Sequence, residues 1–141
     1  MINEELKLTG HVTVVVNDKV VQEIPNLVVT AGKGYVASRM KDTTDGAMSH
    51  MAVGTNSTAA AAGDTALGTE SGRVSLTSTT VSANVITYVA TFPAGTATAA
   101  LTEAAILNAS SGGTMLCRTV YATVNKGASD AMTITWAITA S

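Results

Sequence analysis

Residues 132–140 read MTITWAITA, and this stretch decides the fold class. Large apolar side chains occupy every second position from Met132 to Ile138, and threonine or alanine stands between them. A period of two places successive side chains on opposite faces of a β-strand, so we expect one face of this segment to be buried. Trp136 stands at the centre of the pattern and is predicted to anchor the core.

Most of the chain upstream also reads as strands separated by turn residues. Asn17-Asp18 tolerates left-handed turn geometry and predicts a hairpin between its two neighbouring strands. The other sharp connections are Pro93-Ala94-Gly95 and Ser110-Ser111-Gly112-Gly113. The predicted strands cover residues 6–16, 20–24, 47–53, 74–80, 84–92, 96–101, 104–108 and 114–124, followed by the final strand.

Helical spacing is confined to a short part of the sequence. Residues 31–40 carry apolar side chains at helical intervals, and Thr30 is placed to cap them. Asp64 could cap one further helical turn over residues 64–67. We therefore predict an all-β fold, an antiparallel β-sandwich or jelly roll of about eight strands with one short helix, forming a single domain over residues 1–141.

The composition excludes several classes of protein. Of 141 residues, 13% are charged and 4% aromatic, whereas Ala and Thr contribute 23 each, and the formal net charge is −2. This balance offers no basic surface for DNA or RNA. The N-terminal residues carry acid where a secretory signal needs base, and no apolar run is long enough to span a membrane. We expect a soluble protein made in the cytoplasm.

The chemistry-bearing residues are few and isolated. Cys117 is the single cysteine and is expected to be a packed, inert thiol beside Met115 and Thr119 on one strand face. His11 and His50 are the two histidines, and neither has a partner at metal-ligand spacing. Glu70 and Glu103 are isolated acids that nothing pairs as acid and base. We predict no enzyme activity, no cofactor and no metal.

Gly32-Lys33-Gly34 lies where a phosphate-binding loop would begin. The motif needs a glycine in place of Leu27 and a serine or threonine in place of Gly34. We therefore interpret it as a flexible turn between strand and helix.

One long stretch of the chain carries no charge. Residues 74–102 lack any charged side chain, although they should supply about three neighbouring strands. Their outer faces are either threonine-coated and solvated or covered by a partner. Alternation places Thr87 and Thr91 opposite the apolar side chains of the same strand, so these two threonines are the candidate interface residues.

Several motifs resemble a known group of proteins. They are MAVGT at 51–55, GDTALGTE at 63–70, EAAILN at 103–108, SGGTMLCR at 111–118, VNKG at 124–127 and TITW at 133–136. Together they resemble small virion structural proteins of tailed bacteriophages, over about residues 47–141. Within that group the chain is most similar to the jelly-roll capsid cement, or decoration, proteins, including those of short-tailed phages.

The resemblance implies a structural role on the virion. A cement protein binds the outside of the capsid, bridges neighbouring major capsid protein subunits and holds the shell against the pressure of its DNA. It also implies a homo-oligomer, as a dimer, and no catalytic residues. Similar motifs occur in tail-fibre and tail-associated proteins, so a receptor- or glycan-binding tail module is the alternative.

Overall fold

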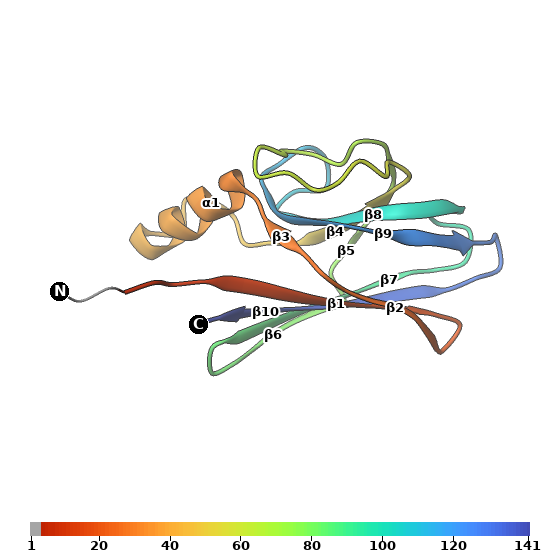
Figure 1. Cartoon of the computed structure of the whole chain (residues 1–141), viewed down its shortest axis with the longest axis horizontal. Helices are drawn as coiled ribbons and strands as arrows, with labels where there is room; N and C mark the ends of the chain where they lie inside the picture. Colours follow the sequence, from red (N-terminus) through yellow and green to blue (C-terminus); the bar gives the residue numbers. More distant parts are fainter. Residues whose placement is uncertain (1–3) are drawn as a thin grey trace.

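Two five-stranded antiparallel sheets pack face to face in the computed structural model, which describes residues 4–141 (Figure 1). Sheet A has the order β2-β1-β10-β7-β6, and sheet B has the order β3-β9-β8-β4-β5. The elements are β1 Leu8–Val16, β2 Lys19–Pro25, β3 Leu27–Val28, α1 Thr30–Lys41, β4 His50–Gly54, β5 Glu70–Ser75, β6 Ser78–Ser82, β7 Val85–Phe92, β8 Ala99–Leu107, β9 Met115–Lys126 and β10 Met132–Ala140. Within residues 4–141, the predicted all-β antiparallel sandwich with one helix is confirmed, with ten strands instead of about eight.

The central strand of sheet A is the segment with the strictest alternation. Buried and half-buried residues alternate along β10, and Trp136 is 0% exposed at its centre. Its largest fully buried companions come from both sheets, including Phe92 of β7, Met51 of β4 and Leu101 of β8. The period of two therefore predicted the core face of β10 correctly.

The first hairpin also forms as predicted. Asn17 and Asp18 have φ angles of 49° and 66°, and β2 pairs antiparallel with β1. Two consecutive left-handed residues give the turn whose twist matches that of paired strands, and asparagine and aspartate tolerate this conformation best among residues with a side chain.

The prediction of one strand over residues 74–80 is wrong. The chain crosses between the sheets at Leu76–Thr77, so β5 belongs to sheet B and β6 to sheet A. The Leu76 amide donates to the Ser49 carbonyl, whereas the Thr77 amide donates to the Val89 carbonyl of β7. Two consecutive backbone amides thus bond to different sheets. The alternation of side chains does not reveal where the chain passes from one sheet to the other.

The two strands predicted over 96–101 and 104–108 are a single strand, β8. Thr102 and Glu103, which lie between the two predicted strands, are both buried in the sheet. Other strand ends differ by a few residues, as for β4, which begins at His50 and not at Ala47.

Helix α1 forms where it was predicted, but its start differs. Val29 is the N-cap and no side chain caps the helix, so the predicted capping role of Thr30 is wrong. Gly32 and Gly34 lie inside the helix and not in a flexible turn. A Cβ on Gly32 would lie 2.0 Å from the Leu116 carbonyl oxygen, so glycine here lets α1 approach the backbone of β9.

A register shift changes the predicted neighbours of Cys117. Leu107 pairs with Met115 while Ile106 pairs with Cys117, so one extra residue of β9 is inserted between the two pairs. Cys117 therefore faces the main core and Met115 faces a second apolar cluster on the other side of sheet B.

No helix within residues 4–141 combines the length and apolar character needed to cross a membrane.

Candidate interaction surface

Both candidate interface residues lie on the outer face of sheet A. Thr91 is exposed and Thr87 half-buried, while Tyr88, Ala90 and Phe92 of the same strand point into the core. Thr87 lies beside Ala137 of β10 on one side and beside Thr80 of β6 on the other. The alternation of β7 is therefore as predicted.

The uncharged surface is built from a different set of strands than the sequence indicated. β6 and β7 are neighbours, but β8 belongs to the other sheet, and β10 completes the surface instead. We define the uncharged face by the outward-facing residues Ser78, Thr80, Ser82, Val85, Thr87, Val89, Thr91, Thr133, Thr135, Ala137 and Thr139. β10 is distant in the chain from the other two strands of this face, and the outward-facing residues of all three strands are uncharged. The length of the uncharged stretch at residues 74–102 did not reveal that β10 belongs to the same face.

Polar contacts on the uncharged face are local. The hydroxyls of Thr91 and Thr133 lie 3.0 Å apart across the β7–β10 pair. Towards the β2 edge of sheet A, His11 Nε2 lies 3.5 Å from Glu23 Oε1. A broad face of methyl and hydroxyl groups offers area and adaptable hydrogen bonding, with little desolvation of charge on contact.

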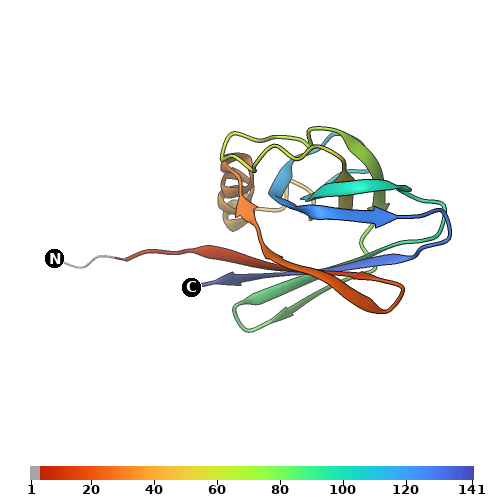
Figure 2. The same ribbon diagram turned by 45° about the vertical axis from the view of Figure 1, so that its right-hand side comes forward.

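The outer face of sheet B is covered by the chain itself. Residues 55–69 connect β4 to β5 and cross above this sheet, as the yellow-green segment shows in both views (Figures 1 and 2). Underneath lies the second apolar cluster, formed by Val29, Ala52, Ala105, Leu107 and Met115, against which Leu67 packs. The two broad faces of the sandwich therefore differ. The outer face of sheet A is bare, whereas the outer face of sheet B is capped by residues 55–69.

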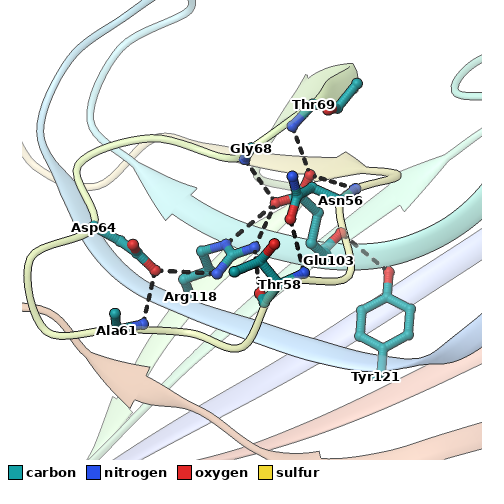
Figure 3. Close-up of polar contacts among 9 residues, drawn as sticks. All are labelled: Asn56, Thr58, Ala61, Asp64, Gly68, Thr69, Glu103, Arg118 and Tyr121. Atoms are coloured by element: carbon teal, nitrogen blue, oxygen red, sulfur yellow. Dashed lines mark hydrogen bonds and ion pairs between the residues drawn. The ribbon is translucent and has the colours of Figure 1, made fainter.

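A buried carboxylate fastens this covering segment to the sheet (Figure 3). Glu103 of β8 is 0% exposed and accepts five hydrogen bonds. Three come from backbone amides of the segment and its end: Asn56 at 3.0 Å, Gly68 at 2.9 Å and Thr69 at 2.9 Å. The other two come from Nε and Nη2 of Arg118, at 3.2 and 3.0 Å.

Arg118 extends the network to the middle of the same segment. Its side chain is 3% exposed, and Nη1 donates to Asp64 Oδ2 at 3.0 Å while Nη2 donates to the Thr58 carbonyl at 3.0 Å. Asp64 also accepts the Ala61 amide at 2.9 Å, so it ties the loop and does not begin the predicted helical turn. One guanidinium thereby holds two points of a segment that carries little apolar bulk of its own.

Glycine is required where the segment leaves β4. A Cβ on Gly54 would lie 2.2 Å from the Thr69 carbonyl oxygen and 2.5 Å from Glu103 Oε2. The network therefore depends on a close backbone approach as well as on its charges.

The network keeps Glu103 ionised despite its burial. Desolvation acts to raise the pKa of this carboxyl, but the amides of Thr69, Asn56 and Gly68 and the Arg118 guanidinium outweigh it and hold the pKa below its ordinary value. With all of these donors engaged, Glu103 is suited to anchoring the loop and not to exchanging protons with a substrate.

Sequence reasoning missed this network and treated Glu103 as an isolated acid. The available signal was that Glu103 is the one charged residue of β8 and Arg118 the one in the middle of β9. A charge within an otherwise apolar strand requires a partner, and adjacent strands can supply it.

The other residues weighed from the sequence lie apart from one another. Cys117 is fully buried, and burial raises the pKa of its thiol, which keeps it protonated at neutral pH. His50 Nδ1 lies 2.7 Å from Ser49 Oγ, and Glu70 pairs with Arg73 on β5 at 2.7 Å. Among residues 4–141, no three His, Cys, Asp or Glu side chains converge as a metal site would need.

Acidification should destabilise the protein through Glu103. Because the pKa is lowered in the folded state, the unfolded chain takes up this proton at higher pH, and stability falls as pH drops from about 4.3 through the folded-state pKa. Urea unfolding across this range should show the loss in the wild type and a shallower one in Glu103→Gln. Identical pH dependence in the two proteins would contradict the prediction. Asp42 and Asp130, whose pKa values are also lowered by hydrogen bonds, are common to both proteins.

Comparison with family models, with curated proteins and with solved structures found no match for the chain.

Proposed function

We propose that this protein is a non-enzymatic structural component of a tailed-phage virion that binds the outside of the capsid and cements neighbouring major capsid protein subunits. The observation that carries the proposal is the uncharged face, which spans β6, β7 and β10 without a charged side chain. Contiguous faces of this kind are typical of surfaces that a protein partner covers.

A modest contact suffices for such a role. Many identical copies bind one shell, and each copy that binds only the assembled state shifts the equilibrium towards it. The motif resemblance over residues 47–141 gives the proposal its partner, the major capsid protein, and its location on the exterior of the virion.

The aromatic side chains weigh against the alternative of a glycan-binding tail module. Sugar rings stack on exposed aromatic faces. Here Trp136, Phe92, Tyr88 and Tyr121 are all buried, and Tyr35 packs partly against the core. The described surface therefore offers a poor stacking platform.

Electron cryomicroscopy of virions from the phage that encodes the chain tests the location. The proposal expects density for this protein at regular sites on the head. Density confined to the tail would overturn the cement function in favour of the tail module.

Lysine on the uncharged face should weaken binding to heads. Thr87→Lys and Thr91→Lys would each bring an unpartnered charge into the contact, costing about 2 kcal/mol, or roughly thirtyfold in affinity. The measurement is retention of each variant on expanded heads prepared without this protein. Thr65→Lys, on the covering segment over sheet B, is the matched control and should be retained as the wild type is. Wild-type retention of all three variants would identify a solvated, threonine-coated face.

A further inference from the structure

Three of the four sheet edges carry features that discourage pairing with another strand. β2 has Lys19, Glu23 and Pro25, and its register with β1 shifts. β3 is two residues long and leads directly into α1. β5 carries the Glu70–Arg73 ion pair, and its register with β4 shifts. Charges, proline, bulges and short length are the usual means by which proteins protect exposed edges.

The fourth edge, β6, has none of these features. Its sequence, STTVS, contains no charge, proline or glycine, and its register with β7 is continuous from Ser78 to Ser82. All five residues are exposed. The hairpin of β6 and β7 forms the lower margin of the molecule in the first view and extends away from sheet B (Figure 1). This edge therefore presents backbone donors and acceptors for another strand.

We propose that β6 pairs antiparallel with β6 of a second copy of this chain, about a two-fold axis at Thr80. The segment is nearly symmetric about that residue, so Ser78 would lie opposite Ser82 of the second copy and Thr79 opposite Val81. Thr80 would lie opposite its own counterpart. Threonine–threonine and threonine–valine are favourable cross-strand pairs, and a strand that complements itself satisfies the symmetry of a closed dimer.

The exposure of Val81 supports the same partner. Val81 is 71% exposed, yet it pairs with Ile86 and so lies on the side of β6 that faces the interior. In the paired edge, the Thr79 methyl group of the second copy covers it. Self-pairing thus buries one of the most exposed large apolar side chains of the molecule.

The pairing also widens the uncharged face. A two-fold axis that joins antiparallel strands in one sheet is perpendicular to that sheet, so both copies present their outer faces on the same side. The inference deepens the proposed function by naming the contact between copies. Its test uses free protein, so its failure and that of capsid binding are distinguishable.

Charge at position 80 is the sharpest test of this arrangement. Wild-type protein should sediment as a dimer, and Thr80→Lys and Thr80→Glu should each shift to monomer, with self-association weakened roughly tenfold or more by like charges placed directly opposite. A mixture of the two variants should restore the dimer, because lysine then lies opposite glutamate.

The control places a lysine on β2, one of the three edges that carry protective features. Val20→Lys, at an exposed position of β2, should sediment as the wild type does. A monomeric wild type, or dimers in both Thr80 variants alone, would overturn the proposal. Failure of the mixture to restore the dimer would overturn the register centred on Thr80.

Discussion

Replacement of Glu103 with alanine is expected to lower the free energy of unfolding by about 3–5 kcal/mol. The substitution leaves the Arg118 guanidinium buried without its nearest counter-charge. It also removes the acceptor for the amides of Asn56, Gly68 and Thr69. Groups that lose a buried partner bear the full cost of their desolvation, which exceeds the net contribution of the bonds themselves.

Urea unfolding followed by Trp136 fluorescence measures this effect. Glu70→Ala is the matched control, since it removes the same side chain from a more exposed pair with Arg73 and should cost less than about 1 kcal/mol. Combining Glu103→Ala with Arg118→Ala should cost less than the sum of the single changes, because the second change removes the orphaned charge. A Glu103→Ala protein no less stable than Glu70→Ala would contradict the assigned role.

Replacement of Trp136 with alanine is expected to cost about 3–5 kcal/mol through the cavity it leaves. Trp136 is fully buried on the central strand of sheet A, with Val12 of β1 and Tyr88 of β7 as its cross-strand partners. Loss of its ring therefore removes packing from both sides of β10. Because it is the single tryptophan, unfolding must be followed by circular dichroism.

Trp136→Phe separates the effect of volume from that of polarity. The indole N–H is buried and has no hydrogen-bond partner among residues 4–141, so phenylalanine removes an unsatisfied donor while it keeps an aromatic ring. We expect a smaller loss than for alanine. Equal losses for the two variants would show that the ring is not what packs the core.

The sequence predicted correctly those properties that are decided within one strand or one turn. The burial of Trp136, the turn at Asn17–Asp18 and the outward direction of Thr87 and Thr91 all follow from local periodicity or turn geometry. These properties need no knowledge of which strands become neighbours.

The features that were not predicted depend on the register between neighbouring strands and on backbone hydrogen bonds. The sheet change at Leu76–Thr77 is defined by which carbonyls accept two consecutive amides, and the Met115 side chain changes face because of a bulge. The Glu103–Arg118 pair joins residues fifteen apart along the chain, on strands whose register shifts twice. The three loop groups that donate to Glu103 are backbone amides, which every sequence possesses, so no residue type marks them.

The capped face of sheet B gives the molecule a front and a back. A symmetric sandwich could adhere by either broad side, but here the segment held by Glu103 and Arg118 occupies one side, and only the other presents bare strands. Under the proposed function, every copy lands on the shell in the same orientation, with the capping segment towards the medium. The surface that binds the shell and the surface that is exposed to the medium then consist of different residues of one small protein. The exposed tips of that segment could change in sequence without touching the surface that binds, provided that the anchoring residues stay.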